Sequence, residues 1–319
     1  MNKDARIYVA GHRGLVGSAI LRALKSRGYP NLIARTHAEL DLLDQEAVRS
    51  FFNAEQPEYV FLAAAKVGGI MANSTYPADF IYKNIVIQTN VIDEAWKCNV
   101  SRLLFLGSSC IYPRDCPQPM KEEYLLTGPL EPTNRPYALA KIAGIEMCWS
   151  YNRQYGTKYV AAMPTNCYGP GDNYDLDNSH VLPALIRKMH EAKVRGDENV
   201  VVWGTGSPRR EFLFSDDLAD ACLFIMNLDD GEFNELTVKS DSPPLINIGC
   251  GEDLTISELV DLVAKVVEYN GRIVWDREKP DGTMLKRLDI TRLGELGWRS
   301  TTTLEEGLRL AYEDYLNGK

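Results

Sequence analysis

Short apolar runs alternate with segments of helical periodicity along the first half of the chain. The run at 59–65 lacks polar–apolar alternation, which is typical of a strand covered on both faces. Strands that alternate with helices of ten or more residues indicate βαβ units and a parallel sheet. The expected fold class is α/β, with a Rossmann doubly wound parallel sheet. Its strands are predicted at 7–10, 32–35, 59–65, 102–107 and 159–163, and its helices at 15–26, 45–54, 79–98 and 136–155.

The pattern changes after residue 168, where the polar, turn-rich stretch GPGDNYDLDNS begins. We therefore divide the chain into a cofactor lobe at 1–170 and a smaller C-terminal α/β substrate lobe at 171–319. Segments near 212–227 and 245–250 have the apolar character of further Rossmann pieces. We expect these two segments to return to the first lobe.

The second lobe carries its own helix and strand signals. Helices are expected at 181–192 and 254–267, and a strand at 200–203. The helix at 254–267 opens with Thr255 and Glu258 in the spacing of a capping box. The stretch FLFSDDLADACLFIM reads as a strand, an N-cap and a helix in succession.

A glycine-rich turn separates the first expected strand from the first helix. Its G-x-x-G-x-x-G spacing lets the chain turn tightly, approach a pyrophosphate and pack the helix closely on the sheet. Because a strand precedes the turn and a helix follows it, the turn predicts a dinucleotide site. We expect this site to include Gly11, His12, Arg13, Gly14, Leu15, Val16 and Gly17.

The end of the second expected strand bears on which dinucleotide is bound. NAD-preferring folds place an Asp or Glu there to accept from the ribose 2′-hydroxyl, but this chain has Arg35-Thr36-His37 and no acid. Arg35 together with Arg13 suits a 2′-phosphate, so we predict NADP(H). The alternative is that Arg35 is an ordinary solvated residue at a strand end.

Tyr137 and Lys141 lie four residues apart, on one face of an expected helix. A phenol has a pKa of about 10, and a nearby ammonium would lower that pKa while also holding the cofactor ribose. The motif Y-x-x-x-K alone is weak evidence for a catalytic pair, since it occurs by chance in many helices. Ser108 strengthens it, because Ser108 follows an apolar strand at the edge where doubly wound sheets bind ligands. Its hydroxyl can polarise a ketone while Tyr137 supplies the proton, and in this combination the chain resembles the extended short-chain dehydrogenase/reductases.

Cys110 follows the serine by two residues, on the same side of an extended chain. Carbons that flank a ketone carry acidic protons that a thiolate can remove. A free thiol ionises near pH 8.5, so a cationic neighbourhood would be needed. An epimerisation also needs an acid, for which His180 is the candidate because histidine titrates near neutrality. Taken alone, Cys110 could be a small buried residue and His180 a structural one.

Composition limits the partners. Lys and Arg total 35 against 44 Asp and Glu, a net charge of −9, which argues against nucleic acid or an anionic membrane as the main partner. No apolar stretch approaches 18 residues, and the N-terminus does not read as a signal peptide. Seven cysteines without a C-x-x-C pair suit free thiols in a reducing compartment, and the four scattered histidines predict no metal site. A cytoplasmic enzyme is the default interpretation.

More specific motifs narrow the resemblance. The chain resembles the GDP-L-fucose synthase family of GDP-4-keto-6-deoxy-mannose epimerase/reductases over about residues 5–315. That family epimerises C3 and C5 of the keto sugar and then reduces the C4 ketone with NADPH. The motifs are GHRGLVGSAI, AAAKVGGI, TYPADFIY, LGSSCIYP, EPTNRPYALAKIAG, SYNRQYG, MPTN-x-YGP, NSHV-x-PALIRK, VVWG-x-G-x-x-REFL and KPDGT.

The resemblance implies a role for each matching residue. Cys110 would be the base and His180 the acid of epimerisation, while Ser108 and Tyr137 hold the carbonyl oxygen. Lys141 would anchor the ribose, and a homodimer built on the helices 79–98 and 136–155 is expected by analogy. Further cofactor contacts are implied at Arg35, His37, Asp41, Leu42, Leu106, Gly107, Ser108, Lys141, Pro164, Thr165, Asn166 and His180, and sugar-nucleotide contacts at Lys188, Trp203, Arg210 and Asp281.

The chain departs from the family pattern at two places, and three alternative functions stay open. His37 stands where the family often has arginine, and Arg209 beside Arg210 adds a charge of uncertain register. The rivals are a sugar-nucleotide 4-epimerase with tightly bound NAD, a 4,6-dehydratase, and an inactive NADP(H)-binding relative. A dehydratase would carry an Asp-Glu pair where Cys110-Ile111 stands, and a 4-epimerase has no need of Cys110 with His180.

Overall fold

The computed structural model describes residues 1–176, 179–237, 242–279 and 281–318. Six parallel strands form its central sheet in the order β10–β5–β4–β3–β1–β2. This confirms the Rossmann-type α/β class expected from the apolar runs. The strands are β1 (Ile7–Ala10), β2 (Leu32–Ile33), β3 (Tyr59–Leu62), β4 (Arg102–Leu106), β5 (Tyr159–Pro164) and β10 (Leu245–Ile248).

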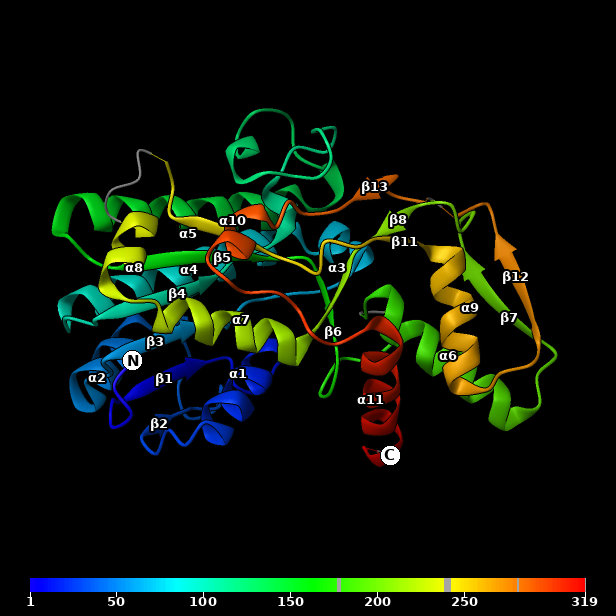
Figure 1. Cartoon of the computed structure of the whole chain (residues 1–319), viewed down its shortest axis with the longest axis horizontal. Coiled ribbons are helices and arrows are strands. Elements are labelled where there is room, and N and C mark those ends of the chain that lie inside the picture. Colours follow the sequence, from blue (N-terminus) through cyan, green and yellow to red (C-terminus); the bar gives the residue numbers. More distant parts are fainter. Residues whose placement is uncertain (177–178, 238–241, 280, 319) are drawn as a thin grey trace.

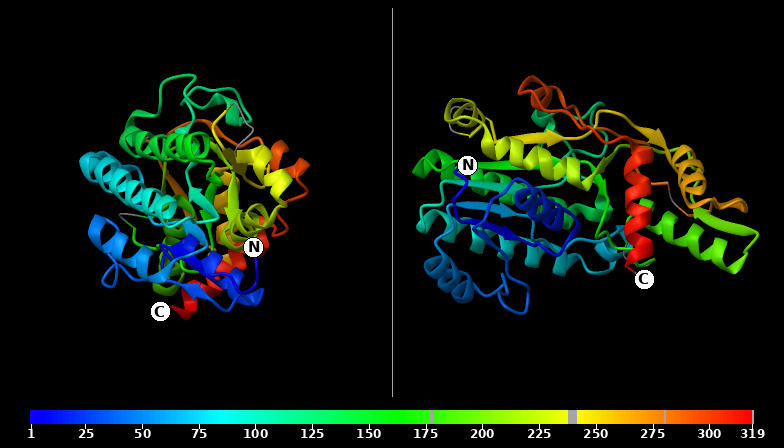
Figure 2. Two further views of the ribbon diagram at one scale, coloured as in Figure 1. Left: turned by 90° about the vertical axis from the view of Figure 1, so that its left-hand side faces the viewer. Right: turned by 60° about the horizontal axis from the view of Figure 1, so that its bottom comes forward.

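Helices cover both faces of this sheet, as the end-on view in Figure 2 shows. Ile7 and Val9 of β1 point into one core, and Tyr8 and Ala10 point into the other. Both faces are buried, so the strands are continuously apolar. One face carries α2 (Gln45–Glu55), α4 (Pro77–Lys97) and α5 (Arg135–Tyr155), and the other carries α1 (Leu15–Ser26), α7 (Ser215–Asn227) and α8 (Asp230–Thr237).

Two segments from the second half of the chain, β10 and α7, belong to the central sheet and its covering helices. β10 pairs with β5, with Leu245 opposite Ala161, and α7 packs beside α1. Their apolar residues complete the core on that side of the sheet. The chain thus leaves the central sheet after β5 and returns to it, while the division at residue 170 stays a prediction.

The remaining elements gather at one end of the sheet (Figure 1), around a third core formed by α6, α9, α11 and β7. β7 pairs with β12, β8 lies between β11 and β13, and β6 pairs with β9. The elements are β6 (Asn166–Tyr168), α6 (Val181–Arg195), β7 (Asn199–Trp203), β8 (Arg209–Arg210), β9 (Phe212–Phe214), β11 (Leu254–Thr255), α9 (Ile256–Val267), β12 (Arg272–Asp276), β13 (Leu285–Lys286) and α11 (Leu304–Asn317). Short helices connect these elements. They are the 3-10 helices η1 (Ser109–Ile111), η2 (Glu122–Tyr124) and η3 (Pro132–Asn134), and the α-helices α3 (Ile70–Thr75) and α10 (Thr291–Glu295).

Element ends differ in places from the expected ones. The capping box is confirmed: Glu258 N donates to Thr255 Oγ1 at 3.1 Å, and Thr255 N donates to the Glu258 carboxylate at 2.7 Å. The helix nevertheless begins at Ile256, because the two preceding residues pair with β8. The N-cap expected before α7 is wrong as a side-chain cap, since Phe214 holds that position and cannot accept a hydrogen bond.

Candidate active site

The glycine turn after β1 forms a tight cradle at the N-terminus of α1. Gly11 has φ +83°, and its carbonyl oxygen accepts from Gly14 N at 3.0 Å. A Cβ at Gly17 would lie 2.1 Å from Gly11 O, so only glycine fits there. Gly14 caps α1 without any side-chain hydrogen bond, which leaves the helix N-terminus open to an anion. His12 Nδ1 is buried beside this turn without a partner in the structure. The cradle therefore fits the pyrophosphate of a dinucleotide.

Arg13 and Arg35, the two arginines expected at a 2′-phosphate, act on one carboxylate. Hydrogen bonds from Thr36, then the charges of Arg35 and Arg13, hold the pKa of Glu39 below its usual value. The Arg35 guanidinium forms an ion pair with Glu55. Glu39, four residues beyond Arg35, is the acid that approaches this turn, where its carboxylate accepts from Thr36 N at 2.7 Å.

His37, Asp41 and Leu42 lie in the turn that follows. His37 Nδ1 is 3.7 Å from Asp41 Oδ1, and its side chain is exposed. The other Asp41 contact is local, because Oδ1 accepts from Leu43 N at 2.9 Å. Leu42 O accepts from Asn90 Nδ2 of α4 at 2.9 Å, so this turn is held against the sheet layer.

Ser108, Tyr137 and Lys141 come together where β4 ends against α5. Burial is the main cause that raises the pKa of Tyr137, the Cys110 charge adds to it, and a hydrogen bond with Ser108 opposes it. Lys141 is 3% exposed and donates to Leu106 O at 2.7 Å; burial lowers its pKa to about 7. Its ammonium lies 5.8 Å from the centre of the Tyr137 ring. The pKa of the phenol thus shifts upward, against the lowering expected from the lysine.

The edge of the sheet beside this group is closely packed. Gly107, the residue after β4, donates its N–H to Ala162 O at 2.8 Å, and a Cβ there would strike Met163. Pro164 ends β5. Thr165 Oγ1 and Asn166 Nδ2 both donate to Glu211 O, at 3.2 and 3.0 Å. Hydrogen bonds thus join the residues that follow β4 and β5 into a floor at this edge of the sheet.

Cys110 sits in η1, where two polar groups converge on its sulfur. Asn134 Nδ2, from the turn before α5, is 3.1 Å from Sγ, and Lys286 Nζ of β13 is 3.6 Å from it. The Cys110 backbone N–H donates to Ser108 Oγ at 3.3 Å. The cationic neighbour that the thiol chemistry requires is thus a lysine from the distant end of the chain.

His180 caps the N-terminus of α6 in an extended conformation. Surrounding protein lowers its pKa, and the charge of Lys286 lowers it further. The same lysine therefore acts on both His180 and Cys110. The structure brings the expected acid and the expected base to one ammonium group.

The four residues expected at the sugar nucleotide lie in one patch, on and around α6, β7 and β8. Lys188 Nζ lies 5.7 Å from the ring centre of Trp203, whose side chain is 53% exposed, and burial lowers the pKa of the lysine. Asp281 accepts from Thr205 N and Oγ1 at 2.7 and 2.9 Å, two residues after the tryptophan. Burial lowers the pKa of Arg210, and the Asp281 charge opposes that shift.

The neighbouring arginines face in different directions. Arg209 forms an ion pair with Asp253, which helps raise its pKa. Arg210 Nη1 donates to Arg209 O at 2.8 Å, and its guanidinium lies toward Asp281. The register of the pair is thereby settled: the second arginine, not the first, faces the patch.

Sequence reasoning missed three residues of this region. Asn134 stands three residues before Tyr137, and its place just before a helix could have drawn attention to it. Lys286 lies in a stretch without a motif, so only tertiary contacts reveal it. Glu211 is fully buried, and its carboxylate accepts from Gly251 N and Leu288 N at 2.7 and 2.9 Å.

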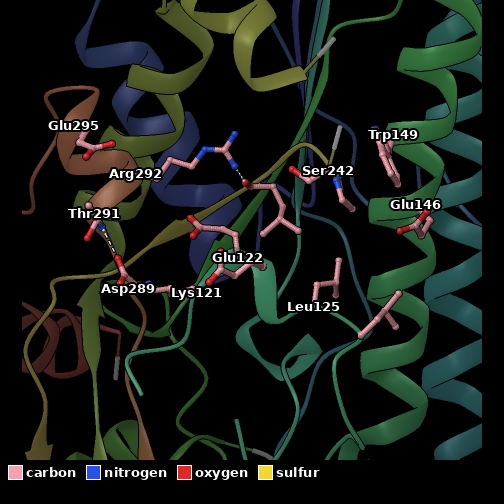
Figure 3. Close-up of a pocket in the computed structure, with 14 residues that line it drawn as sticks. Lys121, Glu122, Leu125, Glu146, Trp149, Ser242, Asp289, Thr291, Arg292 and Glu295 are labelled. Atoms are coloured by element: carbon pink, nitrogen blue, oxygen red, sulfur yellow. Dashed lines mark hydrogen bonds between the residues drawn. The ribbon is translucent and has the colours of Figure 1, made fainter. Parts of the chain in front are cut away.

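A separate pocket of about 670 Å³ lies between η2, α5 and α10 (Figure 3). Two of its polar groups are paired within the protein: Arg292 Nη1 donates to Leu245 O at 2.8 Å, and Glu122 Oε1 accepts from Asn247 N at 2.9 Å. No expected site residue lines it among the residues that the structure describes. It is distinct from the site at the end of β4.

The NAD dependent epimerase/dehydratase family matches residues 7–238 of the chain. The chain belongs to this family. It is 56% identical to "GDP-L-fucose synthase 1" of Arabidopsis thaliana over 315 residues, which cover 99% of this chain and 94% of that protein. The similarity to GDP-L-fucose synthases that the motifs indicated is thereby confirmed.

Solved structures of family members have the same fold. A GDP-6-OMe-4-keto-L-xylo-heptose reductase from C. jejuni is 40% identical, with a TM-score of 0.94 over 100% of this chain and 99% of its own. A GDP-L-fucose synthetase from Naegleria fowleri bound to NADP is 25% identical, with a TM-score of 0.87 over 100% and 96%. In the described part of this family member, no helix is long and apolar enough to cross a membrane.

Proposed function

We propose that this protein converts GDP-4-keto-6-deoxy-D-mannose to GDP-L-fucose, by epimerisation at C3 and C5 and reduction at C4. One observation carries the proposal: Cys110 lies beside the Ser108–Tyr137 pair, and the charge of Lys286 reaches both Cys110 and His180. A reductase needs only the second pair, whereas an epimerase that works beside a ketone needs a base and an acid as well.

NADP(H) is the proposed cofactor. The open α1 N-terminus and the glycines packed against Gly11 O suit a pyrophosphate. Arg13 and Arg35 supply positive charge for a 2′-phosphate, which would compete with Glu39 for both arginines. When bound, NADPH supplies the hydride that reduces the C4 carbon. Lys141 would hold the ribose, and Thr165 and Asn166 would line the nicotinamide side of the floor.

Each residue of the site has a separate proposed role in the reaction of the sugar. The C4 carbonyl oxygen would accept hydrogen bonds from Ser108 and Tyr137, which makes the protons on C3 and C5 acidic. Cys110 would remove each proton as a thiolate, and His180 would return one to the opposite face. After both inversions, Tyr137 would protonate the C4 oxygen as hydride arrives. The raised pKa of Tyr137 keeps the phenol protonated for that step.

The patch in the second lobe is proposed to bind the nucleotide. Lys188 and Arg210 suit a diphosphate, because charge-assisted hydrogen bonds are strongest there. Trp203 offers an exposed aromatic face. Asp281 would then act in part through Thr205, which it already binds at both N and Oγ1.

A reductase that does not epimerise is the second candidate, because the similar C. jejuni protein carries the name of a keto-heptose reductase. The two candidates predict different products from the same keto sugar. Epimerisation followed by reduction yields an L-configured 6-deoxy sugar, whereas reduction alone leaves the configuration at C3 and C5 unchanged.

We also propose that the protein is a homodimer that pairs through α4 and α5. Tyr82 and Ile85 of α4 and Leu139 of α5 are exposed apolar residues on this face. Such side chains favour burial against a second copy. Sedimentation equilibrium should give twice the chain mass, and a Tyr82→Glu/Leu139→Glu variant should sediment as a monomer.

The function is tested by incubation of the purified protein with GDP-4-keto-6-deoxy-D-mannose and NADPH. Loss of NADPH absorbance together with GDP-L-fucose, identified by NMR, is the expected result. A product that retains the manno configuration would favour the reductase. No turnover at all, with NADPH still bound, would contradict both candidates.

A further inference from the structure

Lys286 places a positive charge beside the proposed epimerisation base. Its Nζ lies 3.6 Å from Cys110 Sγ, and its charge also acts on His180. Its charge also reaches Cys116, in the loop that follows. Asn134, Tyr137 and Ser108 also interact with Cys110, and none of these three side chains carries a positive charge.

We propose that Lys286 is a positioning residue that favours the thiolate form of Cys110 and makes protonated His180 a stronger acid. An ammonium within about 4 Å of a sulfur favours the thiolate. The same ammonium adds to the lowering of the His180 pKa, which makes the protonated imidazole a stronger proton donor. This inference rests on the proposed epimerisation, but the charge effect exists in the protein without substrate.

The backbone holds Lys286 in place from several sides. β13 runs parallel to β8, with Lys286 opposite Arg210. The next residue is paired on its other side, since Met120 N donates to Arg287 O at 2.8 Å and Arg287 N donates to Gln118 Oε1 at 3.0 Å. Two residues further, Leu288 N donates to the buried Glu211 carboxylate. The segment therefore lies between the loop that follows η1 and the small sheet of the second lobe.

This arrangement links nucleotide binding to the chemistry. Arg210 belongs to the nucleotide patch, and its strand partner Lys286 contacts the sulfur. Glu211, the residue after Arg210, binds Thr165 and Asn166 through its carbonyl and Leu288 through its carboxylate. One short stretch of chain thus aligns the nucleotide patch, the sheet edge and the cation beside Cys110.

The direct test is the rate at which iodoacetamide alkylates Cys110 as a function of pH, measured by peptide mass mapping on the substrate-free enzyme. Lys286→Met keeps the aliphatic stem and removes the charge, while Lys286→Arg keeps a cation. Lys265→Met, at an exposed ion pair with Glu305, is the matched control for loss of a lysine. Mapping separates Cys110 from the six other cysteines.

We expect the pH midpoint for alkylation of Cys110 to move upward by about one unit in Lys286→Met, a roughly tenfold slower reaction at neutral pH. Lys286→Arg and Lys265→Met should leave the midpoint near that of the wild type. An unchanged midpoint in a folded Lys286→Met protein would overturn the proposal. If this variant does not fold, a Lys286→Arg midpoint more than one unit above that of the wild type overturns it, and an unchanged one supports it.

A second measurement uses the substrate. Solvent deuterium uptake at C3 and C5 should follow a bell-shaped pH profile, and both limbs should move to higher pH in Lys286→Met. The cation is removed from base and acid alike, so both hold their protons to higher pH. A merely structural lysine would lower the height of the profile without moving it. If the wild type shows no exchange, the proposed function fails while the alkylation result still decides the role of Lys286.

Discussion

The two halves of the site are built in different ways. The reduction half, Ser108 with Tyr137 and Lys141, comes from β4 and α5, which are neighbours in one lobe. Burial dominates its pKa values: it raises that of Tyr137 and lowers that of Lys141. The epimerisation half adds His180 from α6 and Lys286 from β13. Here a charge from a remote segment reaches both titrating groups.

The two halves differ in what shifts the pKa values of their titrating groups. In the reduction half, burial causes the pKa shifts, so these shifts do not depend on the position of β13. In the epimerisation half, the shift of the His180 pKa depends in part on where β13 places Lys286. Substitutions should therefore separate the two activities, and the following predictions test that separation.

Tyr137→Phe should have the largest effect. Because the phenol both holds and protonates the C4 oxygen, kcat for NADPH oxidation should fall about 10³-fold. Deuterium exchange at C3 and C5 should fall less, since Ser108 still contacts the carbonyl. Stopped-flow absorbance and NMR measure the two rates. Equal losses in both would contradict the division of the site into two halves.

Cys110→Ser should reverse that pattern. A serine hydroxyl is a far weaker base source than a thiol, so exchange at C3 and C5 should fall by about 10²-fold or more. The affinity for NADPH, measured by fluorescence titration, should stay unchanged. Cys98→Ser is the control, because Cys98 is half-buried at the far end of α4. Wild-type exchange in Cys110→Ser would remove Cys110 from the role of base.

The two arginines near Glu39 should differ. Arg13→Ala should raise the KM for NADPH about 10- to 30-fold, the loss of a charged hydrogen bond to phosphate. Arg35→Ala should raise it only about threefold, because Glu55 already engages that guanidinium. Glu39→Gln should lower the KM, as a competing carboxylate is neutralised. The same variants assayed with NADH, which lacks the 2′-phosphate, should show little change.

Lys141→Met should lose activity yet reveal the cost of the buried ammonium. The pKa of Lys141 is about 7 in the folded protein and near 10.4 in an unfolded chain. Between these values the unfolded chain binds more protons, so Lys141 makes the free energy of unfolding rise with pH. Urea denaturation should show the wild type gaining about 2 kcal/mol on the variant between pH 7 and pH 9. A constant difference would mean that Lys141 stays charged in the fold.

The fold was largely predictable because its signal is local. β1 and α1 have the bounds that the apolar pattern predicted. The strand predicted at 32–35 ends at Ile33, and the two-residue strands β8, β11 and β13 were not predicted at all. Two residues carry too little periodicity to stand out, and such strands exist only because partners from elsewhere bind them.

The candidate site was predictable to the same extent. Ser108, Cys110, Tyr137 and Lys141 stand in motifs, and the structure brings them together around the end of β4. Glu39 was overlooked because it approaches Thr36 through a turn after β2 and belongs to no motif. Arg209 and Arg210 could not be told apart until Asp253 and Asp281 were seen on different sides of them.

The sequence by itself identified the reactive groups of the site: a glycine cradle, a Tyr–Lys pair on a helix, and a serine and a thiol on one turn. It also identified the family. Local spacing suffices for these, because turns, helices and strands place residues within a few positions of one another. Only the tertiary structure decided the electrostatics, since charge acts through space. Lys286 stands 176 positions from Cys110, and it reaches the sulfur because β13 pairs with β8 and the Glu211 carboxylate holds the residues that follow.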